Sequence, residues 1–149
     1  MKLEDEIYQK KFQNQYEKLA VNLMYTGHWV QSITSGLLKD YDLTIPQYNT
    51  LRILRGQHPN VCTVNTIIER MIDKSSNVSR IIDRLVKKNL VSRKQCKQDR
   101  RAVDLLITSE GLELLHDVDQ VIRNMDQHFM GIGEDQVSKL NDMLDAVRG

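Results

Sequence analysis

The densest chemistry in this 149-residue chain is a run of positive charge in its middle. Between Lys74 and Arg101, ten Lys and Arg residues stand against two Asp residues, a net charge of +8, whereas the whole chain carries +1. Cations concentrated in this way are typical of a surface that binds a polyanion. A solvated face on an ordinary helix is the alternative, but it does not explain why the charge continues through the following segment.

The first half of this run has the pattern of an amphipathic helix. Its apolar residues recur at helical spacing, which predicts an inward-facing stripe made of Val78, Ile81, Ile82 and Leu85. Asp73, Ser75 and Ser76 all suit the N-cap, and the sequence leaves the choice among them open. Small polar residues therefore lead the helix and cations line its outer face, a combination that fits the major groove of a DNA duplex.

Two groups of residues on this helix and beyond it have separate expected roles. Hydroxyl, amide and guanidinium groups at the helix start are expected to read base edges. These groups belong to Ser75, Ser76, Asn77 and Arg80. Other cations are expected to contact phosphates, which would make binding fall steeply with salt. These cations are Lys74, Arg84, Lys87, Lys88, Arg93 and Lys94.

Two β-prone runs follow the helix and predict a hairpin. Residues 90–93 and 102–108 are rich in Val, Leu and Ile, and a polar tip lies between them. Two strands with a cationic tip beside such a helix indicate a winged helix-turn-helix, whose tip enters the minor groove. The tip residues are Lys97, Asp99, Arg100 and Arg101. Asp99 is expected to orient Arg101 or Arg84, the alternative being a plain turn residue.

Three short motifs in this segment carry a family resemblance. They are Asp99-Arg100-Arg101-Ala102-Val103 followed by Leu105, Thr108 and Gly111, then residues 76–80, then residues 83–91. The first resembles the wing signature of the MarR family of bacterial transcriptional regulators, and the others resemble its recognition helix and exit turn. Asn89 stands where the family usually has Gly, and Asn tolerates the left-handed conformation of a helix end. Residues 73–75 also depart from the family pattern, which bears on base preference.

The resemblance covers residues 43–115 and, more loosely, the whole chain. It implies a mainly α fold with a small β-wing (α+β), in which a winged helix-turn-helix lobe joins N- and C-terminal dimerisation helices. The length suits one domain over residues 1–149. We expect the lobe at 43–110 and the dimerisation helices at 1–41 and 111–149.

The residues outside the basic run support this layout. Apolar residues at helical spacing predict one long helix over 3–41, bent near Gly27 or Gly36, and two further stripes after residue 111. Helices this long need a partner for their apolar faces, which predicts an interleaved homodimer. Thr44-Ile45-Pro46-Gln47 predicts a capping box with proline in the first turn, and Thr63 predicts the cap of the next helix.

A symmetric dimer sets the expected mechanism. Two recognition helices would enter successive major grooves of a pseudo-palindromic operator in double-stranded DNA, about one turn apart. The resemblance implies repression that is released by a small, often aromatic or phenolic, effector between the dimer helices and the lobe. A candidate pocket is formed by Tyr25, His28, Trp29, Tyr41 and Tyr48, for which core and interface packing is the alternative.

Cysteine placement offers a redox alternative. Cys62 and Cys96 lie far apart and fit reduced thiols better than a disulfide. Cys96 lies beside Lys94 and Lys97, which favour the thiolate, so oxidation there is a second route to regulation. The peroxide-sensing branch of the family carries its cysteine in the first helix, where this chain has none. Cys62 is expected to be a buried filler.

The remaining residues argue against catalysis. The four histidines are scattered, without HExxH or paired-ligand spacing, and neither a phosphate-binding glycine loop nor a nucleophile elbow is present. We therefore expect no enzyme activity, metal or cofactor. No apolar run has membrane-spanning length and the N-terminus lacks an apolar signal core, so we expect a cytoplasmic protein without a membrane partner. An architectural DNA-binding module without an effector is the other function considered.

Overall fold

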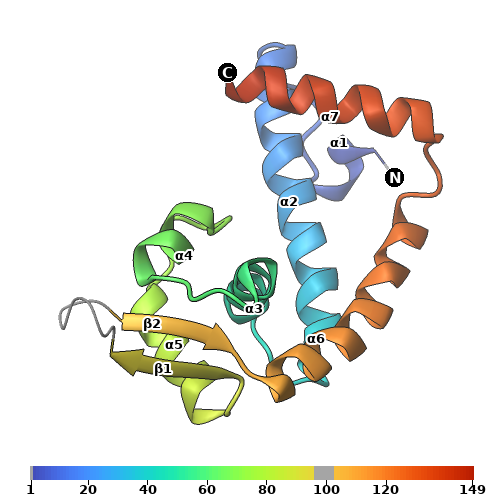
Figure 1. Ribbon diagram of the computed structural model, residues 1–149. Coiled ribbons are helices and arrows are strands. Elements are labelled where there is room, and N and C mark those ends of the chain that lie inside the picture. Colours follow the sequence, from blue (N-terminus) through green and yellow to red (C-terminus); the bar gives the residue numbers. More distant parts are fainter. Residues whose placement is uncertain (1, 96–102) are drawn as a thin grey trace.

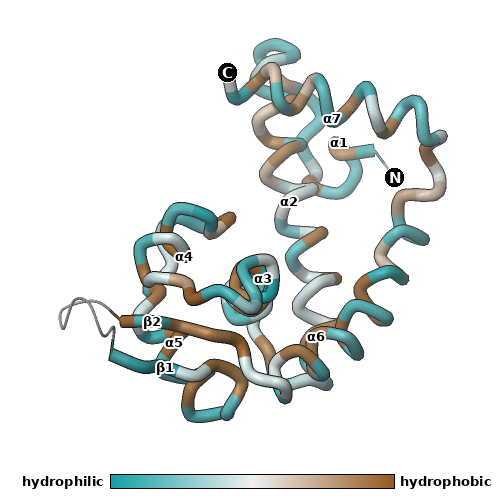
Figure 2. Tube along the Cα trace, in the orientation of Figure 1, coloured by the Kyte–Doolittle hydropathy of each residue, from teal (hydrophilic) through white to brown (hydrophobic). Residues whose placement is uncertain are grey.

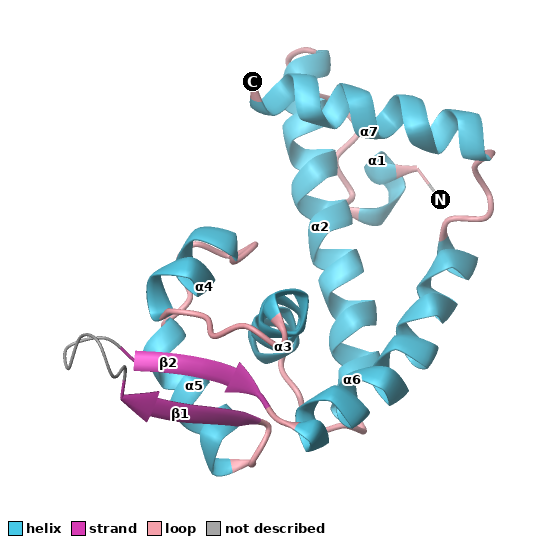
Figure 3. Ribbon diagram, viewed as in Figure 1, coloured by secondary structure: helices cyan, strands magenta, loops and turns pink. Residues whose placement is uncertain are grey.

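The computed structural model describes residues 2–95 and 103–149 as a mainly helical fold with one small sheet (Figure 1, Figure 3). In chain order the elements are α1 (Leu3–Glu6), α2 (Gln15–Lys39), α3 (Ile45–Gln57), α4 (Val64–Arg70), α5 (Val78–Lys87), β1 (Val91–Gln95), β2 (Val103–Ile107), α6 (Ser109–Ile122), the 3-10 helix η1 (Arg123–His128) and α7 (Glu134–Arg148). This order confirms the predicted winged helix-turn-helix lobe with helices on both sides of it. We call the helices before residue 43 and after residue 110 the arms.

The N-terminal region differs from the single long helix predicted over residues 3–41. α1 ends at Glu6, and Tyr8 adopts a left-handed conformation with φ of 55°. α2 begins after Asn14, whose side-chain oxygen accepts hydrogen bonds from the backbone N–H groups of Tyr16 at 2.9 Å and Glu17 at 3.0 Å. These capping bonds start a new helix although the apolar spacing continues. α2 continues without a break through Gly27 and Gly36, the two positions near which a bend was predicted.

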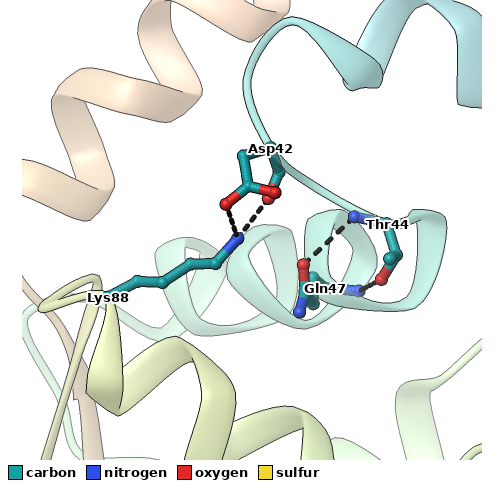
Figure 4. Close-up of polar contacts among 4 residues, drawn as sticks. All are labelled: Asp42, Thr44, Gln47 and Lys88. Carbon is teal, nitrogen blue, oxygen red and sulfur yellow. Dashed lines mark hydrogen bonds and ion pairs between the residues drawn. The ribbon is translucent and has the colours of Figure 1, made fainter.

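Local capping signals place the first two helices of the lobe where they were predicted. The Thr44 hydroxyl accepts from the backbone N–H of Gln47 at 3.4 Å, and the Gln47 side chain accepts from the backbone N–H of Thr44 at 3.1 Å (Figure 4). This is the predicted capping box, with proline in the first turn of α3. The hydroxyl of Thr63 caps α4 by accepting from the backbone N–H of Thr66.

The wing is an antiparallel pair that follows α5 through a tight turn. β1 pairs with β2 from Val91 opposite Ile107 to Gln95 opposite Val103. Asn89 makes the turn with φ of 57°, which confirms its predicted left-handed role. Gly111 lies where the start of α6 passes the wing. A Cβ there would meet the Leu90 carbonyl oxygen and lie 2.7 Å from the Ile107 side chain, so the close packing requires glycine.

The hydrophobic core lies between the wing and the helices around it, and Figure 2 shows the apolar stretch of β2 within this region. Its fully buried side chains include Leu51, Leu85, Leu105 and Leu115. α2, which is described throughout, contributes one buried residue, Leu38, and α7 contributes none. The arms therefore meet the core at one end only, and most of their apolar surface lies outside it. None of the described helices is long and apolar enough to cross a bilayer.

Candidate nucleic-acid interface

The N-cap of the recognition helix α5 is Asn77, and not one of the three residues predicted. Its side-chain oxygen accepts a hydrogen bond from the backbone N–H of Arg80 at 3.1 Å. Asn is as good a cap as Asp or Ser, so sequence preference alone does not select it. The amide oxygen of Asn77 faces the helix in this bond, and the NH₂ group of the same side chain remains as a hydrogen-bond donor for a base edge.

The turn before α5 is organised by Asp73. One carboxylate oxygen accepts from the backbone N–H of Ser75 at 2.9 Å and from its hydroxyl at 2.6 Å, and the other accepts from the Ser76 hydroxyl at 3.2 Å. These bonds, with that of the Ser75 hydroxyl the largest cause, lower the pKa of Asp73 and keep it ionised. Both hydroxyl protons are therefore engaged, and each serine presents its oxygen as an acceptor.

Three predicted DNA-contacting cations of α5 are exposed and unpaired. Arg80, Arg84 and Lys87 face solvent, and no carboxylate in the described part of the chain pairs with them. Val78, Ile82 and Leu85 are buried on the opposite side and Ile81 is half-buried, which confirms the predicted stripe. α5 thus turns free positive charge outward along one face, a geometry that fits a phosphate backbone and base edges together.

Other predicted cations have partners. The Lys74 ammonium donates to the Glu69 carbonyl at the end of α4. Lys88 pairs with Asp42 at 2.8 Å, and Arg93 on β1 pairs with Asp83 on α5 at 2.8 Å. Sequence reasoning missed these pairs because their partners lie in other elements, and charge counting carries no distance information.

Two further cations extend the basic surface. Lys94, a predicted phosphate contact on β1, is exposed. Lys39, which the prediction omitted, is exposed at the end of α2. It lines a cleft of about 680 Å³ with Arg84 and Lys87, between the start of α3 and the end of α5. The predicted tip residues lie outside the described residues: Lys97, Asp99, Arg100, Arg101 and the candidate redox residue Cys96.

A second cavity, of about 320 Å³, lies between the arms and the lobe. Its walls are largely apolar, and its polar groups include Arg52, whose guanidinium carbon lies 5.7 Å from the centre of the Tyr48 ring. Such a cavity has the size and lining of a small-molecule site. Its lining residues include Val30, Gln31 and Thr34 of α2, Tyr48, Asn49 and Arg52 of α3, Met71, Ile72 and Asp73 before α5, and Ile122 and Met125 after the wing.

The five aromatic residues predicted to form a pocket, all of them described, do not come together. Only Tyr48 lines the 320 Å³ cavity. Tyr25 and Trp29 line a separate cavity against α1, where Tyr25 donates to Glu6. Trp29 also packs edge-on against His128 and Phe129, each with ring centres 5.9 Å apart. His28 is exposed, and Tyr41 packs against the core. Residues that are close in sequence on a helix can point in different directions, so these side chains do not line one pocket.

The described residues include no group of His, Cys, Asp and Glu side chains that could hold a metal ion. Cys62 is buried, as expected for a filler. Its backbone forms an isolated antiparallel β-bridge with the backbone of Leu105 on β2. Burial is the main cause that raises the pKa of its thiol. This environment disfavours the reactive thiolate at Cys62.

Comparisons with known proteins agree with this geometry. Residues 43–103 match the model of the MarR family. The chain is 31% identical over 122 residues to the HTH-type transcriptional repressor IacR of Pseudomonas putida, covering 81% of this chain and 71% of that protein. The crystal structure of the S. aureus MepR–DNA complex superposes with a TM-score of 0.78 at 21% identity, over 92% of this chain and 97% of MepR.

A third relative is Bordetella bronchiseptica BpsR, from a structure that concerns regulation of its DNA binding by 6-hydroxynicotinic acid. It superposes with a TM-score of 0.78 at 22% identity, over 89% of this chain and all of BpsR. At these identities the two structural matches show a shared fold. The winged helix and its cationic face define a DNA-binding regulator of transcription. The chain belongs to the MarR family.

Proposed function

We propose that this protein is a dimeric repressor that binds a pseudo-palindromic operator in double-stranded DNA and is released by a small ligand. The single observation that carries the proposal is α5, which presents Arg80, Arg84 and Lys87 on one exposed face beside a structured polar N-terminus. The repressor role is supported by the name of the relative IacR. The winged lobe at 43–110 reads DNA, and 1–41 and 111–149 associate two copies.

The residues around the start of α5 contact the base edges of the operator. Arg80 forks onto guanine in the major groove, the commonest specific contact of arginine. The Asn77 amide donates to a purine acceptor, and the oxygens of Ser75 and Ser76 accept from base amino groups. Asp73 fixes both serines before DNA arrives, which lowers the entropy cost of ordering them.

Affinity comes from phosphate contacts along the edge of this surface. Arg84 and Lys87 lie on α5, and Arg93 and Lys94 lie on the wing strand β1. Lys74 contacts the backbone near the start of α5, and the tip residues Lys97, Asp99, Arg100 and Arg101 extend the contact to the minor groove. Each phosphate neutralised makes binding more sensitive to salt.

The effector of this proposal is a small aromatic molecule held in the 320 Å³ cavity. The cavity borders α2, α3 and the turn that leads into α5, so an occupant touches the arms and the base of the recognition helix at once. Arg52 and Tyr48 supply polar groups in a largely apolar lining, which suits an aromatic ring with a polar substituent. The structural match BpsR, whose DNA binding is regulated by 6-hydroxynicotinic acid, is a protein with an effector of this class.

Selection of bound sequences from random double-stranded DNA tests the proposal. The expected product is a short inverted repeat with half-sites about one helical turn apart. Repeating the selection with a panel of aromatic and phenolic acids is expected to reveal at least one that abolishes enrichment. Even recovery of unrelated sequences would contradict specific binding and favour an architectural role, and enrichment unaffected by every acid would contradict the effector.

A further inference from the structure

Lys88 differs from its neighbour Lys87 although both end the same helix. Lys87 is exposed, whereas the side chain of Lys88 is 30% exposed and is directed to the corner between α2 and α3 (Figure 4). Its ammonium lies 2.8 Å from the Asp42 carboxylate and also donates to the Asp42 backbone carbonyl. One residue therefore supplies two acceptors to this cation.

The position of Asp42 explains why a cation is held there. Asp42 follows the last turn of α2 with φ of 51°, and the next N–H, from Leu43, donates back to Leu38 at 3.2 Å. Carbonyl groups at a helix C-terminus carry partial negative charge that favours a cation. Lys88 itself caps the C-terminus of α5. Its ammonium thus connects the ends of two helices, one in the arms and one in the lobe.

We propose that the Lys88–Asp42 pair is a tie that positions the recognition helix against the arm, so that Lys88 is a positioning residue and not a phosphate contact. The proposal rests on the proposed function, because it concerns how α5 is presented to the operator. It replaces the phosphate contact that charge counting assigned to Lys88.

Two of the attachments that hold α5 lie on opposite sides of it, one in the turn that precedes its start and the other, the tie, at its end. Near its start, the side-chain oxygen of Asn49 on α3 accepts from the backbone N–H of Ile72 at 3.0 Å, beside the 320 Å³ cavity. At its end, Lys88 reaches Asp42. An occupant of the cavity acts on the first attachment, and the second then serves as the pivot. Since both half-sites are read together, the angle of α5 to α2 sets the spacing that a dimer accepts.

Salt dependence of operator binding separates a tie from a phosphate contact, with Lys87→Gln as the matched control for Lys88→Gln. The slope of log K against log salt concentration is negative, and loss of a phosphate contact reduces its magnitude by about 0.9 for each subunit. We expect Lys87→Gln to show this decrease. We expect Lys88→Gln to weaken operator binding about fivefold for each subunit, the upper range for one exposed ion pair, with the wild-type slope.

Asp42→Asn is expected to change operator affinity in one direction if Lys88 contacts phosphate and in the other direction if Lys88 is a tie. Asn tolerates the left-handed backbone, so the corner keeps its conformation. If Lys88 contacted phosphate, release from the carboxylate would tighten binding and steepen its salt dependence. The tie predicts weaker binding, by about fivefold at most for each subunit, with an unchanged slope. It also predicts that the double variant binds no more weakly than Lys88→Gln, because the two residues act as a unit.

Varying the distance between the operator half-sites tests directly whether the tie positions α5. Wild type is expected to reject an operator with one base pair inserted between its half-sites, and both tie variants are expected to reject it less. Binding by Asp42→Asn that equals or exceeds wild type, a slope for Lys88→Gln that falls with that of Lys87→Gln, or unchanged spacing preference would overturn the tie while leaving the proposed function intact. Failure of wild type to bind any duplex would overturn both. Circular dichroism melting confirms that each variant is folded.

Discussion

The winged lobe and the helical arms differ in how they treat apolar surface. Among the described residues, fifteen large hydrophobic side chains are exposed, and twelve of them lie before residue 43 or after residue 110. The lobe closes its own core around Leu51, Leu85 and Leu105, which are fully buried. The arms form helices by capping and spacing but leave apolar faces open. Exposed patches of this kind are typical of association surfaces. The comparison teaches that the lobe is closed in a single chain, and that the proposed dimer depends on the apolar faces of the arms.

The largest effect is expected from a charge placed on an arm. Met143, on α7, is 65% exposed in the single chain, so Met143→Asp leaves the fold of one copy intact. In a symmetric dimer the variant buries two uncompensated carboxylates, at about 3–5 kcal/mol each. Association and operator binding are expected to weaken about a thousandfold or more, by sedimentation and gel shift. Ser138→Asp is the control, because Ser138 is exposed and the helical spacing places it on the side of α7 away from Leu140 and Leu144. Equal behaviour of the two variants would remove α7 from the interface.

A core truncation in the lobe is expected to act on stability. Leu85 is fully buried, and Leu85→Ala removes packing and leaves a cavity, at a cost of about 2–5 kcal/mol of unfolding free energy. Leu140→Ala on α7 is the comparison, because Leu140 is 44% exposed and its cost should appear only as weaker association. Urea unfolding at several protein concentrations separates the two. If both variants lost a similar amount of unfolding free energy at every protein concentration, the distinction between lobe and arms would be contradicted.

A change on the reading face is expected to affect DNA alone. Arg80→Ala removes an exposed guanidinium and is expected to weaken operator binding by about 1–3 kcal/mol per half-site while relaxing the preference at one base position. Sedimentation should show an unchanged dimer. Titration against operators with each base replaced in turn locates the position. A uniform loss over all sequences would assign Arg80 to phosphate instead.

The smallest effect is expected at the pair between Asp83 and Arg93. Both side chains are exposed, so Asp83→Asn should change the unfolding free energy by less than about 1 kcal/mol. It releases Arg93 and removes one negative charge from the DNA-facing side, so binding at low salt is expected to tighten a few-fold with a steeper salt dependence. Weaker binding would show that Asp83 holds Arg93 in the pose that DNA requires.

Features that depend on neighbours in sequence could be predicted. The capping box at Thr44, the left-handed Asn89, the inward stripe of α5 and the two strands of the wing each rest on a few adjacent residues. The choice of Asn77 as N-cap could not be predicted from preference, because four candidates within five residues have similar capping strength and Asp73 holds the two serines instead.

Features that depend on distant neighbours were missed for a physical reason. Trp29 and Val30 are adjacent in α2, yet Trp29 packs on η1 and Val30 lines the 320 Å³ cavity. A helix turns by about 100° for each residue, so aromatic clustering along the chain does not make a pocket. The ion pairs of Lys88 and Arg93 also join separate elements, and only the assembled fold brings their partners within reach.

Hydroxyl-radical footprinting on a selected duplex tests the central claim most directly, namely that two copies of α5 meet one DNA molecule. The account predicts two protected backbone patches related by two-fold symmetry, with centres about one helical turn apart. A single patch, or protection spread evenly along the duplex, would contradict it.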